Sequence, residues 1–540
     1  MNSKELKALS KDAAKCYREY DYAKALNKIN QLLNIDKDNK YGIHLKACIL
    51  IDSWDRINQP QSQIMEAISY LKILLNDGDT TNRWVFLGNM GNAYSELAKS
   101  QLGKSGGSLN EAIIDDIFKA KDCYQESLGL NQKQPHLWIN KGNLLNLIGR
   151  YLEAIDCYDR AILIDHKHCN SWGNRGLGCQ RLSKLVTNKD DKKLLYGHGL
   201  KYIAIELMLH PNFDISNDFK KYIEDLISKN NIKLDLDKTL MGLLPKRRKN
   251  IYDEFNISNN INLGFDEFFN KFCEEEGFFL NLHFDCNNCG SSRLDLIPFS
   301  FISSIDEHKS EYSFFKRLYN ILDDYSTARF LLALAQFRGK DFRFLDKQRY
   351  EPDYSLNYIH NVELLKESFI KIVNTYDKIA FFLKDYEKLI RNDGKEIDES
   401  GISFFSPNSI FDNSKILENN NYQTDLIAMN SIRIDFDKGE FKNIKNIRNY
   451  LVHRYFILHD IVDPKLLTYP YTRKGEQIED LQYHEDVNKF YRLVKNSLRL
   501  LKNTLFSLSF YVQYKENQKK SIIKGPIVDL YWSYDTDTII

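Results

Sequence analysis

The stretch RNYLVH contains an arginine, an asparagine and a histidine whose types and spacing could support chemistry. Arg448 and Asn449 are adjacent, and His453 follows four residues after Asn449. An imidazole titrates near neutral pH and can move a proton, whereas a guanidinium stays charged and can hold two phosphate oxygens at once. These side chains are therefore either the centre of a site that acts on phosphate esters or the polar face of an ordinary helix.

Helical phasing helps to separate these two interpretations. The segment FKNIKNIRNYLVHRYFILH predicts one helix over residues 442–459, because its apolar residues recur at spacings of three and four. The residues expected to face the core are Ile444, Ile447, Leu451, Tyr455 and Leu458. Asn449 and His453 then lie on the opposite face, with Arg448 at its border and Phe456 close to Asn449. An apolar Phe456 on this face predicts that another surface covers it.

A second pair in the same segment has the same spacing of arginine and histidine. Arg454 and His459 are five residues apart, but no asparagine follows Arg454. Short motifs of this kind often arise by chance, so the asparagine, the helix face and the surrounding helices decide between the pairs. They favour Arg448, Asn449 and His453 as the catalytic residues.

Long amphipathic segments surround the motif. They are EYSFFKRLYNILDDYSTARFLLALAQF, NVELLKESFIKIVNTYDKIAFFLKDYEKLI, the motif segment itself and VNKFYRLVKNSLRLLKNTLFSLSFYVQY. Their apolar spacing predicts four helices of one bundle, with a polar insertion of about fifty residues between the second and the third. Only SIRIDF and the tail SIIKGPIVDLYW have the pattern of strands.

RNYLVH resembles the RNxxxH form of the R-x4-6-H motif of HEPN domains, which are four-helix bundles found in many RNA-cleaving toxins and antiviral effectors. DDYSTARFLLALA and TYDKIAFFL also resemble HEPN sequence, so the resemblance covers about residues 311–515. It implies a homodimer in which two motif helices share one composite site. For RNA, the 2'-OH would attack the adjacent phosphate, with His453 moving protons, Arg448 stabilising charge and Asn449 orienting the groups.

The N-terminal part of the chain repeats with a period of 34 residues. Trp138 aligns with Trp172, and Gly142 aligns with Gly176. The stretch PHLWINKGNLLNLIGRYLEAIDCYDRAILIDHKH resembles a tetratricopeptide (TPR) repeat, which is a pair of helices. Five such units predict a helical solenoid. Stacked helix pairs form a groove, and we expect this groove to bind a protein or peptide ligand, with a purely structural spacer as the alternative.

Four residues in the middle of the chain could hold a structural zinc ion. Cys273, His283, Cys286 and Cys289 are zinc-ligand types, and the last two form a CxxC pair. No second CxxC accompanies them, so buried or incidental cysteines are the alternative. Catalysis is expected to require no cofactor, because no carboxylate cluster typical of two-metal nucleases lies near the motif.

The composition limits the classes of partner. Lys plus Arg number 75 and Asp plus Glu number 74, so no global field draws the chain to nucleic acid, and any basic site must be local. No apolar run is long enough to cross a membrane, and the nine cysteines have no framework spacing. We therefore expect a cytoplasmic protein without a membrane partner and without disulfides.

Taken together, these patterns predict an all-α protein. The expected parts are a TPR-like helical solenoid at residues 1–212, a connecting region at 213–310, a HEPN-like four-helix bundle at 311–520 and an extended tail at 521–540. The expected function is an endoribonuclease whose repeats sense or recruit a protein, as in prokaryotic antiviral or toxin systems. The alternative is a non-catalytic scaffold that dimerises through an inactive bundle.

Overall fold

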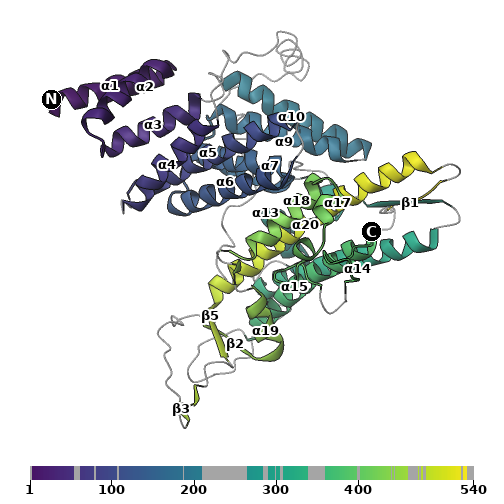
Figure 1. Cartoon of the computed structure of the whole chain (residues 1–540). Helices are drawn as coiled ribbons and strands as arrows, with labels where there is room; N and C mark the ends of the chain where they lie inside the picture. The colour runs from purple at the N-terminus through teal and green to yellow at the C-terminus, as the bar shows by residue number, and fades with distance from the viewer. Residues whose placement is uncertain are drawn as a thin grey trace. The chain divides into compact units, whose positions relative to one another are not determined.

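A computed structural model of the chain places its helices in two compact units (Figure 1). The units are residues 1–181 with 197–244 and residues 182–196 with 245–540. The structure describes residues 3–53, 61–77, 81–105, 109–186, 188–209, 264–283, 290–297, 299–304, 308–337, 359–397, 402–438, 441–442, 444–459, 472–473, 476–477, 482–523 and 527–531.

The N-terminal part of the chain is built from helix pairs. In the residues described, the pairs are α1 (Ser3–Arg18) with α2 (Tyr22–Ile35), α3 (Lys40–Ser53) with α4 (Ser62–Asn76), α5 (Arg83–Lys104) with α6 (Glu111–Leu130), α7 (Pro135–Leu147) with α8 (Tyr151–Ile164), and α9 (Cys169–Leu185) with α10 (Lys189–Leu209). The two helices of a pair lie against each other. Successive pairs stack in chain order, as a helical solenoid requires.

One hydrogen bond recurs at the 34-residue period. The indole Nε1 of Trp138 donates to Gln132 O at 2.9 Å, and the indole Nε1 of Trp172 donates to His166 O at 2.8 Å. In each case a tryptophan near the start of a first helix holds the loop that precedes it. The repeated sequence therefore encodes a repeated contact, not only a repeated pattern of apolar residues.

Two glycines allow the helices of a pair to approach closely. A Cβ atom at Gly142 would lie 2.6 Å from the ring of Tyr158, and a Cβ atom at Gly91 would lie 2.7 Å from the ring of Tyr124. Both tyrosines are almost fully buried. A small residue on the first helix thus makes room for a tyrosine on the second, which explains why the two residue types recur together in the repeats.

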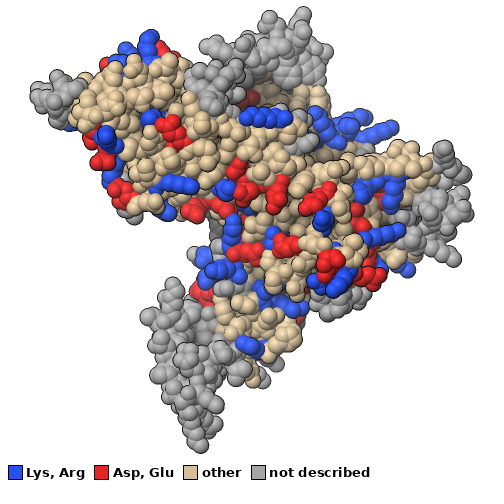
Figure 2. Space-filling view, viewed as in Figure 1, with Lys and Arg blue, Asp and Glu red and all other residues tan. Residues whose placement is uncertain are grey.

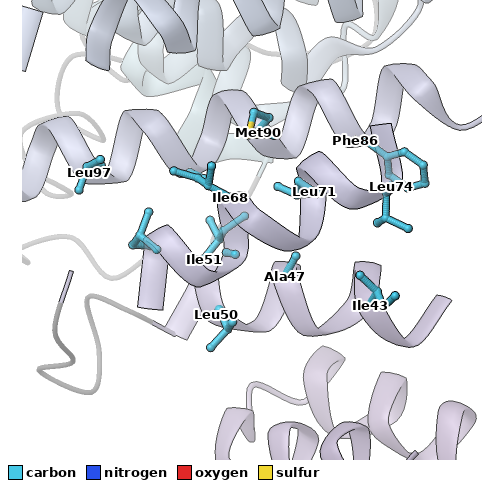
Figure 3. Packing of buried hydrophobic residues seen from close by; sticks show 13 residues of the cluster. Ile43, Ala47, Leu50, Ile51, Ile68, Leu71, Leu74, Phe86, Met90 and Leu97 are labelled. Carbon is cyan, nitrogen blue, oxygen red and sulfur yellow. The ribbon is translucent and has the colours of Figure 1, made fainter. Parts of the chain in front are cut away.

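Apolar side chains fill the space between consecutive helices of the array. Figure 3 shows one such cluster, in which α3, α4 and α5 contribute Ile43, Ala47, Leu50, Ile51, Ile68, Leu71, Leu74, Phe86, Met90 and Leu97. All of these side chains are at most 7 % exposed. A second cluster joins α1 and α2 to α3, so the core is continuous from α1 to α5.

The second unit is a helical bundle. Its long helices are α14 (His308–Gln336), α15 (Ile359–Tyr386) and α20 (Val487–Ile522), and the shorter α18 (Thr424–Asp435) packs against α20. Helix α19 (Ile444–His453) packs against α15. The smaller helical elements are α13 (Phe265–Glu276), the 3-10 helix η1 (Gly290–Arg293), α16 (Ile410–Asn413) and α17 (Ile416–Asn419). The predicted all-α class, a repeat array followed by a bundle, is confirmed.

Helix α18 corrects one prediction. The alternation in SIRIDF predicted a strand, but most of this stretch belongs to α18, and residues 425–433 are all buried. Alternation does not distinguish a strand from a helix that is buried on every side. The insertion between the second and third predicted helices therefore carries a buried helix and is not only a polar loop.

Short strand pairs complete the second unit. Strand β1 (Ser300–Ser304) pairs antiparallel with β6 (Ile527–Tyr531), which confirms a strand in the predicted tail. Strand β2 (Tyr455–His459) pairs in parallel with β5 (Gln482–Asp486). Strands β3 (Thr472–Arg473) and β4 (Glu476–Gln477) form a minimal antiparallel pair.

The described part of the predicted connecting region packs on the bundle. The Lys502 ammonium, on α20, donates to the carbonyl oxygens of Gly277 and Phe279 at 2.7 Å each. These carbonyls lie in the chain that follows α13. A buried ammonium needs such acceptors to offset its desolvation, so Lys502 fixes this segment against α20.

Figure 2 shows basic and acidic side chains interspersed on the face that it draws, in line with the formal net charge of +1. Among the helices described, none combines the length and the apolar composition that crossing a bilayer requires.

Candidate active site on helix α19

Helix α19 carries the three predicted residues but ends earlier than the sequence indicated. It stops at His453, and the chain continues as strand β2. Strand β2 is extended because it pairs with β5, with Phe456 opposite Tyr483. The predicted helix over residues 442–459 is therefore wrong beyond His453.

Phe456 is covered by its own chain. Its side chain is only 6 % exposed, and its ring stacks on Tyr483 with centroids 5.5 Å apart. The centroid of the Phe490 ring, on α20, lies 4.9 Å from the centroid of the Phe456 ring. The predicted covering surface exists, but it comes from the same molecule, so Phe456 does not support a dimer.

The inner face of α19 is held in two ways. Ile444 and Ile447 are each 2 % exposed and pack into the bundle. Lys445 donates to the carbonyl oxygen of Phe405 at 3.1 Å and to that of Ser406. Burial of the ammonium lowers the pKa of Lys445. The first turn of α19 is thus tied to the loop of residues 402–409.

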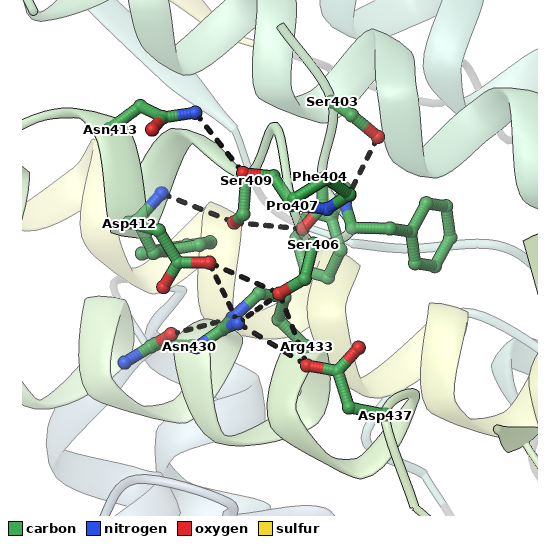
Figure 4. A network of polar contacts seen from close by, with 12 residues as sticks. Ser403, Phe404, Ser406, Pro407, Ser409, Asp412, Asn413, Asn430, Arg433 and Asp437 are labelled. Carbon is green, nitrogen blue, oxygen red and sulfur yellow. Dashed lines mark hydrogen bonds and ion pairs between the residues drawn. The ribbon is translucent and has the colours of Figure 1, made fainter.

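This loop is itself fixed by α18 through a polar network (Figure 4). The Arg433 guanidinium donates to Ser406 Oγ at 2.5 Å, to Asp412 Oδ2 at 3.0 Å and to Asp437 Oδ2 at 3.4 Å. Ser406 Oγ also donates to Asp412 Oδ2 at 3.1 Å. Two carboxylates offset the charge of a guanidinium that is largely buried. Helix α18 therefore positions α19 through the loop that receives Lys445.

The outer face of α19 opens into a pocket of about 400 Å³. Its lining consists of Asn446, Asn449, Tyr450, His453 and Arg454. These residues follow one another at spacings of three, one, three and one, which places them on a single helical face. Asn449 and His453 are exposed, as predicted, and their side chains meet in this pocket.

Arg448 lies to the side of the pocket. Its side chain is half-buried, and Nη2 donates to Asn374 Oδ1 on α15 at 3.4 Å. Its Nε is buried and has no hydrogen-bond partner among the residues described. The structure therefore brings Asn449 and His453 together, and it places Arg448 at the border between α19 and α15.

Sequence reasoning missed three residues of the pocket, which are Asn446, Tyr450 and Arg454. The Arg454 guanidinium lies over the Tyr450 ring, with Cζ 5.2 Å from the centroid, and Nη1 is 3.5 Å from the Tyr450 hydroxyl. A helical wheel centred on His453 could have found all three, because they lie seven and three residues before it and one after it. His459 lies on strand β2, so Arg454 and His459 do not share one helix.

The proposed zinc ligands are only partly described. Cys273 is buried in α13, where burial raises the pKa of its thiol to about 12. The backbone N–H of His283 donates to Asn281 Oδ1 at 3.0 Å. Cys286 and Cys289 lie outside the described residues. Within the described ranges, no three His, Cys, Asp or Glu side chains group as metal ligands do, so the zinc site stays a prediction.

Comparisons with known proteins found a family model and solved structures that are similar to parts of the chain. Residues 305–515 match the family model of LA2681-like HEPN domains. This range contains α14, α15, α18 and α19, together with most of α20. No curated protein matches the chain.

Solved structures similar to the chain include several TPR proteins. A TPR protein of Thermus thermophilus is 13 % identical, with 41 % of this chain and 99 % of that chain covered and a TM-score of 0.31. MamA of Desulfovibrio magneticus is 13 % identical, with 40 % and 99 % covered and a TM-score of 0.28. The helix pairs and the 34-residue period are those of a TPR-type array, and residues 305–515 match an LA2681-like HEPN domain.

Proposed function

We propose that the HEPN domain is a metal-independent endoribonuclease with His453 at its centre. The observation that carries this proposal is the exposed imidazole of His453, which shares a pocket with the Asn449 amide in a domain that matches a HEPN family. Asn449 lies one turn before His453 and can orient the imidazole or the phosphate. Arg448, at the edge of the same helix, would stabilise the developing negative charge.

The reaction requires two proton transfers and no metal. A base takes the proton of the 2'-OH, the 2'-oxygen bonds to the adjacent phosphorus, and the bond from phosphorus to the 5'-oxygen breaks. An acid then protonates the departing 5'-oxygen, which leaves a 2',3'-cyclic phosphate and a 5'-OH. A histidine can fill both roles because its imidazole gains and loses protons near neutral pH.

A homodimer would supply a second histidine. In a twofold arrangement each copy presents the same face, so His453 of one copy and His453 of a second copy can act as base and acid. Two apolar side chains beside His453 support this proposal, because Val452 is 46 % exposed and Tyr455 is 67 % exposed. These residues, rather than Phe456, would then lie in the interface.

The decisive experiment is cleavage of RNA in EDTA by the full chain and by a His453→Ala variant. We expect the wild type to cut RNA and to leave 2',3'-cyclic phosphate ends, and we expect the variant to be nearly inactive. RNA with a 2'-deoxy residue at the cut site should resist, because its nucleophile is missing. Cleavage that needs added magnesium, or that survives His453→Ala, would place the chemistry elsewhere.

We propose that the TPR-type array binds a protein or peptide that controls the nuclease. Polar contacts link the first helices of successive pairs. His44 Nε2 lies 2.8 Å from Asn89 Nδ2, Asn92 Nδ2 donates to Asn89 Oδ1 at 3.4 Å, and Asn140 Nδ2 donates to Asn92 Oδ1 at 2.9 Å. Carboxamides can both donate to and accept from a peptide backbone. A sensor of this kind fits a cytoplasmic antiviral or toxin system in which a protein trigger activates RNA cleavage.

A scaffold without catalytic activity is the second candidate, and one observation favours it. Arg448 is turned towards Asn374 and does not line the pocket with His453. If this arrangement persists in the dimer, the motif lacks its charge-stabilising group. A wild type that dimerises and binds a partner, yet cuts no RNA under any condition tested, would establish the scaffold.

A further inference from the structure

We propose that Arg454, supported by Tyr450, forms a subsite that holds a phosphate of the RNA strand next to His453. This inference rests on the proposed ribonuclease function and assigns a role to a residue outside the Arg448, Asn449 and His453 motif. Arg454 follows His453 directly, and both line the pocket of about 400 Å³ on α19. A strand whose scissile phosphate lies at His453 would pass Arg454 with a neighbouring phosphate.

The geometry prepares Arg454 for this contact. The backbone N–H of Arg454 donates to Tyr450 O at 3.0 Å, so Arg454 continues the last helical turn although α19 ends at His453. Its guanidinium lies over the Tyr450 ring, which restricts the long side chain. An arginine held in this way loses less conformational freedom when it binds a phosphate.

Tyr450 is itself supported by packed aromatic rings. Its ring lies 5.3 Å from that of Tyr483, on centroids, and Tyr483 stacks on the buried Phe456. The pairing of β2 with β5 thus provides the base on which Tyr450 rests. This gives the strands a function in the site, because they determine where the ring beneath Arg454 lies.

The chemistry of the lining fits a phosphodiester. The five lining side chains are two carboxamides, a phenol, an imidazole and a guanidinium, and none of them is acidic. Asn446 offers an amide donor one turn before Asn449 and Tyr450. Arginine holds phosphate oxygens bidentately and stays charged at all physiological pH values, so it suits a contact that positions the strand.

Binding of an RNA that cannot be cleaved tests this subsite independently of catalysis. We would titrate the full chain, in EDTA, against a fluorescently labelled single-stranded RNA with 2'-O-methyl groups. Arg454→Ala should weaken binding about tenfold and should lower the slope of log K against log salt by about one, because one phosphate contact is lost. Arg454→Lys should retain part of the affinity, since a lysine keeps the charge but not the bidentate fork.

Arg391→Ala is the matched control. Arg391 is an exposed arginine of the same unit that pairs with Asp393 in the loop after α15, and it does not line the pocket. Its replacement should change neither the affinity nor the salt slope. On cleavable RNA, Arg454→Ala should raise KM while kcat changes less than about threefold, whereas His453→Ala should lower kcat.

These measurements distinguish a failure of the proposed subsite from a failure of the proposed nuclease function. Wild type that binds the modified RNA through Arg454 but does not cut cleavable RNA would refute the nuclease and keep the subsite. An unchanged affinity and salt slope for Arg454→Ala, or no RNA binding by the wild type, would overturn the subsite. Equal displacement of the RNA by inorganic phosphate and by an unlabelled oligonucleotide, at equal phosphate concentration, would also overturn it, because the site would then bind any anion.

Discussion

Polar side chains contact one another in the array, whereas those on the outer face of α19 are exposed. In the array, His44 contacts Asn89, and Tyr124 donates to Asn92, which also accepts from Asn140. On α19, the side chains of Asn449 and His453 are exposed in an open pocket. The same residue types therefore contact one another across the helices of the array, whereas on α19 they are exposed beside a pocket.

This difference indicates how the two histidines should respond to substitution. A polar group bonded inside a fold contributes to stability, and its removal leaves its partner unsatisfied. A polar group directed at solvent contributes little to stability, so its replacement should change the free energy of unfolding little. Stability and activity, measured on matched pairs of variants, test this difference.

The largest effect is expected for the two histidines. His453→Ala should lower RNA cleavage by about 10²- to 10⁴-fold, the range for an acid–base residue, and should leave the free energy of unfolding almost unchanged. His44→Ala should leave RNA cleavage almost unchanged but should cost about 1–3 kcal/mol of stability, because Asn89 loses one of its hydrogen-bond partners. Cleavage rates and urea unfolding of both variants provide the measurement. A His453→Ala variant that is destabilised but active would show that His453 is structural.

The next effect concerns the two aromatic residues at the start of β2. Phe456→Glu should cost about 3–5 kcal/mol of folding free energy, because it places a charge among buried rings. Tyr455→Glu should leave folding intact, since Tyr455 is 67 % exposed, but should weaken the proposed dimer. Thermal unfolding and sedimentation of both variants distinguish these results. A folded but monomeric Phe456→Glu variant would instead place Phe456 in the interface.

Replacement by asparagine should change the free energy of unfolding in opposite directions at two buried aspartates. Burial raises the pKa of Asp425 to about 7, above the value near 3.9 of an unfolded chain. The folded state therefore binds more protons between about pH 4 and 7, so its stability falls as pH rises through this window and levels off above it. Asp425→Asn should remove this slope and should stabilise the protein at pH 8 by about 1–4 kcal/mol.

The matched aspartate in the array is Asp159, which is paired with Arg175. Asp159→Asn should destabilise the protein at pH 8, because it removes the ion pair with the buried Arg175 guanidinium. Urea midpoints at pH 5 and pH 8 for both variants and for the wild type give the comparison. Equal slopes in the wild type and in Asp425→Asn would show that Asp425 is ionised in the folded protein.

The smallest effects are expected at two glycines of the array. Gly142→Ala should cost about 1–3 kcal/mol, because its methyl group would lie 2.6 Å from a ring atom of the buried Tyr158. Gly129→Ala, in α6, should stabilise the protein by about 0.5–1 kcal/mol, because no atom outside its local chain lies within 4 Å of the new methyl group. Thermal unfolding of the two variants measures both signs. A neutral Gly142→Ala would mean that the helix pair can separate to accept the methyl group.

The sequence predicted the array better than the site, and the reason is physical. A contact such as that of Trp138 with Gln132 O repeats 34 residues later at Trp172, so several copies of one pattern support the same interpretation. Each helix also packs mainly against its neighbours in the chain, so local spacing contains most of the information.

The end of α19 could not be predicted in this way. The apolar spacing continues through Tyr455 and Leu458, but β5, more than twenty residues further along the chain, pairs with β2 and ends the helix. As a result Leu458 is buried in a strand and Tyr455 is exposed. The spacing did predict that Asn449 and His453 face outwards, because both residues precede β2, whose conformation depends on pairing with β5.

The pairing of β1 with β6 has a consequence for the order in which the protein is made. Ser300 lies opposite Tyr531, and the backbone N–H of Ile302 is also bonded to Glu516 near the end of α20. Synthesis proceeds from the N-terminus, so the helix pairs of the array can form on the ribosome while these partners of β1 do not yet exist. The array can therefore be complete on the ribosome before the HEPN domain has folded, and under the proposed function a controlling protein could bind the nascent chain first.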